Sequence, residues 1–252
     1  MRGRERMSEL KVAVVTPYYK EPADKLKRCI ESVRTQTYKN IMHYLVADGF
    51  PSPVVDSADP ALRHITLPVS HSDNGNTPRG IGAICALNEG ADIICFLDAD
   101  NLFLPEHVES VVAKFKAQRL GAVFSYRYIF PPGHEDERMI SGEDSDKSHV
   151  DTSCISLSKS AASLLPAWAM MPKALSPICD RVFFYLIQKS GIACSWTEKY
   201  TVLYEAHYSD SYRQLGLPIP DDVHDVDFNK IKNNYSEREC FERLGVGLSL
   251  KF

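Results

Sequence analysis

Short apolar runs alternate with amphipathic stretches through the first half of the chain. Four runs are short, apolar and rich in β-branched residues, which predicts strands: 11–16, 41–47, 64–69 and 93–97. Three stretches carry apolar residues at the spacing of an amphipathic helix: 22–37, 78–88 and 105–118. This alternation predicts βα units, and a fully apolar strand such as 93–97 fits a mostly parallel sheet that is covered on both faces.

The pattern changes in the second half, where a long polar segment separates the predicted elements. Further strands are predicted at 122–130, 150–157 and 192–205, the last as one strand or two, with helices at 176–190 and 228–244. Residues 131–149 are polar, acidic and too many for a plain connection, so they predict a flexible lid or an insertion. The chain is therefore expected to fold as a mixed α/β sheet flanked by helices.

Composition and charge narrow the class of protein. Of the 252 residues, 44% are hydrophobic and 25% are charged, as in ordinary soluble proteins, and a net charge of −4 argues against nucleic acid as a partner. The seven cysteines form no CxxC pair, which argues against zinc and a disulfide framework and favours reduced thiols in the cytoplasm. No apolar run approaches the roughly 18 residues that span a bilayer, so we expect a soluble protein, with peripheral membrane contact left open.

Polar side chains stand at the carboxyl ends of three predicted strands. Tyr18 follows the first strand, Asp48 follows the second, and Asp98 and Asp100 follow the strand at 93–97. In open parallel sheets, ligands bind outside these strand ends. The sequence therefore predicts a binding site at this edge of the sheet.

Asp98 and Asp100 are separated only by Ala99. On an extended chain, residues i and i+2 project to one side, so both carboxylates approach one point, where their charges repel. A divalent cation relieves that repulsion, and hard oxygen ligands suit Mg²⁺ or Mn²⁺. The alternative is an aspartate that caps the turn after the strand, with the help of Asn101.

Three segments occur in a distinctive order: VVTPYYKEPADKLKRCIESVRTQTY at 14–38, LVADGF at 45–50 and ICFLDADN at 94–101. Together they resemble the opening strand and helix, the second-strand aspartate and the Asp-x-Asp motif of the family 2 glycosyltransferases. The resemblance covers residues 12–105 well and extends more loosely to about residue 190. It implies a single domain of the GT-A type, with a Rossmann-like mixed sheet and a nucleotide-sugar donor.

The resemblance also implies a division of the domain into functional parts. Residues 11–105 would form the nucleotide-sugar-binding half, 106–206 the acceptor-binding half, and 207–252 a C-terminal lid and helical tail. The opening residues 1–10 are basic and lack the apolar core of a signal peptide, so they are expected to be a disordered extension, with Met7 as an alternative start.

The resemblance places four residues around the nucleoside. Thr16, Pro17 and Tyr18 would line its pocket, with Tyr18 beside the base. Asp48 would accept a hydrogen bond from a ring N–H of the base, which favours uracil or guanine. The alternative for Asp48 is a turn residue that precedes Gly49.

A second group would surround the diphosphate. Arg79 would reach the nucleotide, although Pro78 departs from the family's usual pattern, and the alternative is a solvated arginine at a helix start. Asp98 would meet the ribose or the cation's water shell, and Asp100 would bind Mn²⁺ or Mg²⁺ directly. His207 would add a third metal ligand, with a surface histidine as the alternative.

The catalytic base of inverting family members is an acid at the start of a late helix, and Asp180 occupies that place. Cys179 stands where an acid is common, so the match is partial. The alternative is an acid that stabilises the helix dipole, and the two roles are compatible. Asp151 and Trp168 would contact the acceptor or donor sugar, against the alternatives of a strand-start acid and of core packing.

The leading hypothesis is an inverting, metal-dependent glycosyltransferase that moves a sugar from a UDP-sugar, or else a GDP-sugar, to a glycan, lipid-linked or small-molecule acceptor. A retaining transferase stays open. A sugar nucleotidyltransferase is disfavoured because TPYYKEP lacks glycine, and a non-catalytic binding module because Asp98 and Asp100 are both intact. His71, His149 and His224 match no partner pattern and are assigned no role.

Overall fold

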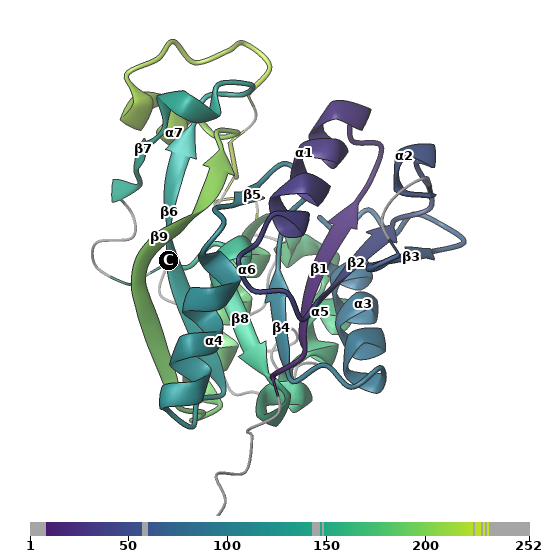
Figure 1. The fold of residues 1–252 in the computed structure, drawn as a ribbon. Coiled ribbons are helices and arrows are strands. Elements are labelled where there is room, and N and C mark those ends of the chain that lie inside the picture. The colour runs from purple at the N-terminus through teal and green to yellow at the C-terminus, as the bar shows by residue number, and fades with distance from the viewer. Residues whose placement is uncertain are drawn as a thin grey trace, which may run out of the picture.

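A computed structural model describes residues 9–56, 60–142, 147, 149–223, 225–227, 229 and 231. The strands are β1 (Val12–Tyr18), β2 (Ile41–Ala47), β3 (Leu62–Thr66), β4 (Ile93–Phe96), β5 (Leu102–Phe103), β6 (Ala122–Phe130), β7 (Met139–Ile140), β8 (Ile155–Ser158) and β9 (Cys194–Glu205). Within the described residues they form one nine-stranded sheet in the order β3-β2-β1-β4-β8-β6-β9-β5, with β7 paired to β6 (Figure 1).

The sheet is mixed, and its longest ladders are parallel. Strands β3, β2, β1 and β4 run parallel to one another, as do β6 and β9. Strand β8 is antiparallel to both β4 and β6, so it joins the two parallel parts. The predicted mixed, mostly parallel sheet is thus confirmed.

The helices cover the sheet on both faces. They are α1 (Ala23–Arg34), α2 (Pro53–Asp56), α3 (Asn76–Asn88), α4 (His107–Ala117), α5 (Pro166–Met170), α6 (Cys179–Lys189) and α7 (Ser209–Leu215), with 3₁₀ turns η1 (Glu135–Glu137), η3 (Thr152–Cys154), η4 (Lys159–Leu164) and η5 (Lys173–Ile178). Helices α1 and α4 lie on one face, and α3, α5 and α6 lie on the other (Figure 1).

Close packing of α3 on the sheet depends on Gly82. A Cβ at this position would lie 2.7 Å from a methyl carbon of Val15 and 2.8 Å from one of Val46, so any side chain would push the helix away from β1 and β2. Farther along the same face, Phe96 of β4 packs edge-on against Phe183 of α6. These contacts hold α3 and α6 firmly against the strands that end at the cavity described below.

Three predicted boundaries are wrong for identifiable reasons. Strand β1 continues through Pro17, because its pairing with β4 ends at Val15 and the proline nitrogen faces that unpaired side. The strand predicted at 150–157 begins only at Ile155, because Asp151 caps the turn η3 through the N–H of Ser153. Residues 173–178 form η5 ahead of α6, because Pro177 has no N–H for a regular helical bond.

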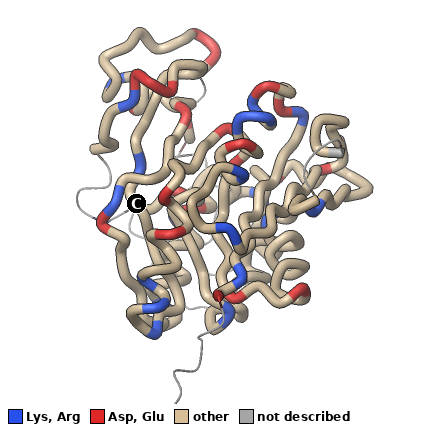
Figure 2. Tube along the Cα trace, viewed as in Figure 1, with Lys and Arg blue, Asp and Glu red and all other residues tan. Residues whose placement is uncertain are grey.

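The other predicted elements are found within a few residues of their expected bounds, and 192–205 is a single strand. The predicted lid or insertion contains η1 and β7, and 143–146 and 148 lie outside the described residues. So do residues 1–8 of the expected N-terminal extension and nearly all of the helix expected at 228–244. In the part of the chain that is described, no helix is long and apolar enough to cross a membrane. Acidic and basic positions are interspersed along the trace (Figure 2).

Candidate active site

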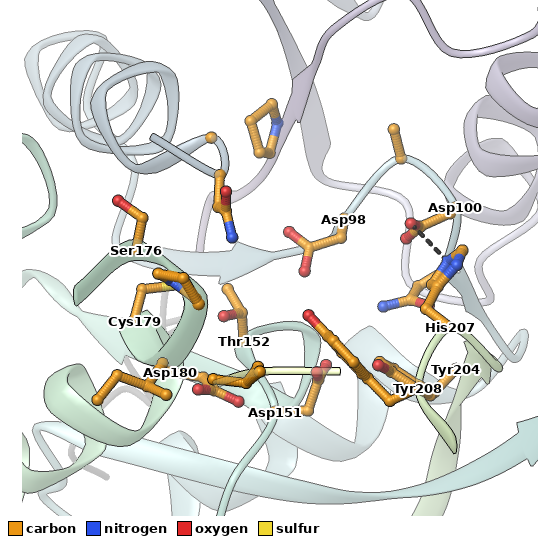
Figure 3. Close-up of a pocket in the computed structure, with 18 of the residues that line it drawn as sticks. Asp98, Asp100, Asp151, Thr152, Ser176, Cys179, Asp180, Tyr204, His207 and Tyr208 are labelled. Carbon is orange, nitrogen blue, oxygen red and sulfur yellow. Dashed lines mark ion pairs between the residues drawn. The ribbon is translucent and has the colours of Figure 1, made fainter. Parts of the chain in front are cut away.

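A cavity of about 840 Å³ opens at the carboxyl ends of β1, β2 and β4. Nine of the residues singled out from the sequence line it: Pro17, Tyr18, Asp48, Arg79, Asp98, Asp100, Asp151, Asp180 and His207. Thr16 and Trp168 do not. In Figure 3, Asp98 lies across the centre of the cavity from Asp151 and Asp180, and Tyr208 projects between them. The strand-end site predicted from the sequence therefore gathers side chains from both halves of the chain.

Arg79 is a buried cation beneath the cavity. Its Nη2 donates to Oδ1 of Asp98 at 2.6 Å, and its Nη1 donates to Oδ1 of Asn76 at 3.0 Å. The guanidinium also lies 4.7 Å above the ring centre of Trp168, and the residue is only 2% exposed. The alternative of a solvated arginine at a helix start is wrong, because α3 begins at Asn76 and turns Arg79 inward.

Trp168 is a core residue, and the prediction that it contacts a sugar is wrong. Its side chain is fully buried, with the indole stacked on Phe183 at 4.0 Å between ring centres. Its other neighbour, Phe96, meets the indole edge-on. One face of the indole carries Arg79, which links Trp168 to the cavity.

Asp98 and Asp100 occupy different electrostatic environments. Removal from water raises the pKa of Asp98, and the negative charge of Asp100 adds to this, although the Arg79 guanidinium opposes both. Burial also raises the pKa of Asp100. The hydrogen bond and charge of His207, together with the charge of Lys25, outweigh burial and leave the pKa of Asp100 lowered. Asp98 is thus held by a fixed cation, whereas Asp100 faces a group that can give up its charge.

His207 lies beside Asp100, with 2.9 Å between Nε2 and Oδ2 (Figure 3). Burial lowers the pKa of His207, but the hydrogen bond and charge of Asp100 outweigh it, and the net shift is upward. Glu205 is 3.9 Å from the same nitrogen, and it is fully buried and engaged by Lys25 and Arg28. Among the described residues, no three His, Cys, Asp or Glu side chains form a metal-binding group by themselves.

Two of the residues expected to line a nucleoside pocket, Thr16 and Tyr18, are placed differently from the prediction. Thr16 is fully buried, and its hydroxyl is 2.9 Å from Nε2 of His43, so its side chain cannot line a nucleoside pocket. Tyr18 lines the cavity but is 2% exposed, and its hydroxyl is 2.7 Å from Nε2 of His64. The neighbouring Tyr19 is 44% exposed and meets Phe50 edge-on, which makes it the open aromatic surface here.

Asp48 is fully engaged by its own chain. Its carboxylate accepts hydrogen bonds from the backbone N–H of His71 and of Ser72 and from the Ser70 hydroxyl, and it also pairs with Nδ1 of His71 at 2.9 Å. Burial raises the pKa of Asp48, but these bonds outweigh it and leave the pKa lowered. Asp48 therefore fixes the segment 70–72 at the cavity rim, a larger role than that of a turn residue before Gly49.

Asp180 stands in the first turn of α6 and is held by two donors. Nε2 of His149 is 2.6 Å from Oδ2, and the N–H of Arg181 donates to Oδ1 at 2.7 Å. Burial raises the pKa of Asp180, but the hydrogen bond and charge of His149, with the Arg181 N–H, leave it lowered. The carboxylate is thus ionised at neutral pH, and it faces the cavity from α6.

Asp151 forms a buried ion pair with Arg127 of β6, with 3.3 Å between Oδ2 and Nη1. Burial raises the pKa of Asp151 to about 6, since the Arg127 charge offsets only part of it and Asp98 adds to it. Arg127 itself lies 4.8 Å from the ring centre of Tyr204. Asp151 therefore belongs to the cavity floor and is not simply an acid at a strand start.

Comparison with known proteins adds to this geometry. Residues 13–158 match the sequence pattern described as glycosyl transferase family 2. The chain belongs to this family. An uncharacterized glycosyltransferase, R139, of Acanthamoeba polyphaga mimivirus is 27% identical over 155 residues, which are 52% of this chain and 62% of the relative. The succinoglycan biosynthesis protein ExoW of Rhizobium meliloti is 28% identical over 102 residues, 39% of this chain and 32% of ExoW.

Solved structures share the fold of this chain. The crystal structure of S. aureus TarS 1–349 in complex with UDP has a TM-score of 0.62 at 13% identity, covering 93% of this chain and 70% of that one. The complex with UDP-GlcNAc has a TM-score of 0.64 with the same identity and coverage. At this identity the likeness concerns the fold, and it agrees with the GT-A architecture that the resemblance implied.

Several residues that line this cavity were not predicted from the sequence. His149, Arg127 and Tyr204 line the cavity, yet no local spacing links them to their partners. His149 is 31 residues from Asp180 in the sequence, so only the fold joins the two. Tyr19 was the more detectable omission, because it lies next to Tyr18 in the quoted opening segment.

Proposed function

We propose that the chain transfers a sugar from a nucleoside-diphosphate sugar, with a UDP-sugar as the first candidate, to an acceptor hydroxyl with inversion at the anomeric carbon. One observation carries this proposal. Asp98 and Asp100, at the end of β4, share a single cavity with Asp180, an ionised carboxylate on α6. The first pair suits the diphosphate end of a donor, and Asp180 suits the acceptor hydroxyl.

The donor side is supported by the surroundings of β1 and α3. The exposed Tyr19 offers a ring for a base, and Arg79 holds Asp98 in place next to the cavity. TarS has been crystallised with UDP and with UDP-GlcNAc, which favours a uridine nucleotide here and leaves a GDP-sugar as the second option. Because Asp48 already accepts bonds from segment 70–72, a base N–H would have to share its oxygens.

A divalent cation fits the pair Asp100 and His207. A carboxylate oxygen and an imidazole nitrogen stand 2.9 Å apart, and both are ligand types that Mn²⁺ accepts. We assign both residues to the metal, with Asp98 nearer the ribose because Arg79 occupies one of its oxygens. A bound Mn²⁺ or Mg²⁺ would offset the negative charge that develops on the leaving diphosphate.

Asp180 is the proposed general base. A base must lie within hydrogen-bond reach of the proton it removes, and Asp180 faces the same cavity as the donor residues. The acceptor oxygen would then attack the sugar from the side opposite the diphosphate, which gives inversion. The acceptor is a glycan, a lipid-linked molecule or a small molecule, and the free and mostly buried thiols favour the reducing cytoplasm as the compartment.

Donor hydrolysis tests the proposed function. The protein is incubated with UDP-GlcNAc, other UDP-sugars or GDP-mannose, with Mn²⁺ or with chelator, and free nucleotide is measured. We expect metal-dependent release of UDP or GDP, loss of that release in Asp100→Ala, and retention in Asp136→Ala, an exposed acid outside the cavity. Absence of both binding and turnover with every donor would refute the transferase, and full activity of folded Asp100→Ala would refute the metal role.

A further inference from the structure

His149 and Asp180 form a pair that the proposed function does not by itself require. We propose that His149 is a positioning residue, whose Nε2–H holds the Asp180 carboxylate toward the acceptor hydroxyl. The inference deepens the proposed function and rests on it. It assigns a role to a histidine that no sequence pattern singled out.

The geometry restricts how the pair is built. Nε2 of His149 lies 2.6 Å from Oδ2 of Asp180. A carboxylate oxygen is an acceptor, so the proton must sit on Nε2, both in the neutral imidazole and in the imidazolium. The contact therefore persists in either charge state of the ring, and only its electrostatic strength changes.

The pair is partly closed to water and open to the cavity. The His149 side chain is 10% exposed and that of Asp180 is 20% exposed, and both residues line the cavity. Since Oδ1 of Asp180 receives the Arg181 N–H, each carboxylate oxygen has one fixed donor. Two donors on different oxygens fix the carboxylate plane, and each oxygen keeps a lone pair for an acceptor hydroxyl.

The proton transfer can be written in full around this geometry. The acceptor hydroxyl gives its proton to Asp180, and its oxygen forms the new bond to the anomeric carbon. The bond from that carbon to the donor phosphate oxygen breaks, and its electron pair leaves with the nucleoside diphosphate. His149 gains and loses no atoms in this step, because its Nε2–H stays a donor to the Asp180 carboxyl group.

His149 also offsets an acidic environment. On its own helix, α6, Asp180 is flanked by Arg181 and Cys179. The titratable groups that act on it from neighbouring elements, besides His149, are Asp98 after β4, Asp151 before η3 and Tyr208 before α7. Without a cation or a donor nearby, the two other carboxylates would raise the pKa of Asp180. Replacing His149 with a neutral group is therefore expected to move the ionisation of Asp180 to higher pH.

Two substitutions separate positioning from simple packing. Gln in His149→Gln offers an N–H donor without a charge that titrates, whereas His149→Ala removes the donor. His134→Gln is the matched control, because His134 is an exposed histidine that immediately precedes η1 and lies outside the cavity. Turnover is followed as UDP-GlcNAc hydrolysis, with water as the acceptor, and donor affinity is measured separately.

We expect His149→Ala to lower kcat about tenfold or more while the donor Kd changes little, because only the base is misplaced. His149→Gln should recover most of kcat. In its pH–rate profile, however, the fall of kcat in acid should begin at a higher pH than in the wild type. His134→Gln should match the wild type in both respects. A folded His149→Ala variant with an unchanged kcat and an unchanged pH profile would overturn the proposal. So would a decrease of kcat in His149→Gln as large as that in His149→Ala.

A second measurement distinguishes failure of this inference from failure of the proposed function. Carbon-13 NMR titration of the aspartate carboxyl groups, assigned with Asp180→Asn, follows Asp180 without any substrate. If the wild type turns over no donor but the pKa of Asp180 is higher in His149→Gln, the transferase assignment fails and the coupling of His149 to Asp180 is supported. If the wild type is active and that titration does not move, the coupling of His149 to Asp180 is wrong.

Discussion

Arg79 and Asp98 form a largely buried ion pair, with 2.6 Å between Nη2 and Oδ1, where the start of α3 meets the end of β4. The Arg79 side chain is 2% exposed and that of Asp98 is 29% exposed, so the cation supports the carboxylate from inside the protein. Trp168 lies beneath the guanidinium. The first acid of the Asp-x-Asp motif is thus held from below by two residues of the core.

Replacement of Arg79 is expected to weaken donor binding and stability together. Arg79→Met leaves Asp98 without its cation, which should lower the free energy of unfolding by about 2 kcal/mol or more. Arg79→Lys keeps the charge, so its loss of stability should be smaller than that of Arg79→Met. Some loss should remain, because lysine lacks the planar fork that reaches Asp98 and Asn76 at once. Denaturant unfolding and calorimetric titration with UDP check both variants, and a Met variant as stable as the wild type would contradict the supporting role.

Trp168 is expected to matter for stability more than for sugar binding. Trp168→Leu opens a cavity beside Phe96 and Phe183 and should cost about 3 kcal/mol in unfolding free energy. Trp168→Leu should lower the affinity for UDP only modestly, because it removes the indole on which the Arg79 guanidinium rests. Trp196→Phe, at the partly exposed second tryptophan, is the control, and guanidinium unfolding is the measurement. Loss of sugar-dependent binding with unchanged stability would restore Trp168 to the sugar site.

Asp48 is expected to stabilise the fold at neutral pH and less so in acid. Since its folded pKa lies below that of an unfolded aspartate, about 3.9, the contribution is present above that value and disappears as pH falls through the folded pKa. Asp48→Asn should lower the unfolding free energy at pH 7 by about 1–3 kcal/mol, because the amide cannot accept all of the segment 70–72 bonds. In urea unfolding, the difference in unfolding free energy between the wild type and Asp48→Asn should be smaller at pH 3 than at pH 7. The control Asp136→Asn should change the unfolding free energy little at either pH.

Two buried neutral histidines are expected to make the protein labile to acid. Burial lowers the pKa of His43 and of His107 to about 3, whereas an unfolded histidine titrates near 6.5. Between these values the unfolded chain binds more protons, so stability falls as pH drops below about 6.5, by up to about 1.4 kcal/mol per pH unit for each residue. His107→Gln should reduce this slope in urea unfolding between pH 7 and pH 5, and exposed His134→Gln should not.

Much of the fold follows from local pattern. Strands β2 and β6 have the predicted bounds, because continuous apolar runs leave few alternatives to a buried strand. The short elements α2, β5 and β7 were not predicted, since pieces of two to four residues carry too little periodicity. The boundary at Ile155 was missed because a side-chain cap decided it, and a cap depends on where one carboxylate points.

By itself, the sequence determined the alternation of strands and helices, the strand-end positions of Asp48, Asp98 and Asp100, and the resemblance to a family, because all of these are properties of neighbouring residues. The tertiary structure decided which side chains meet. Arg79 with Asp98, Asp48 with His71 and Asp180 with His149 are 19, 23 and 31 residues apart. Such pairs form only when crossover connections bring the ends of separate elements to one edge of the sheet, and no local spacing records that approach.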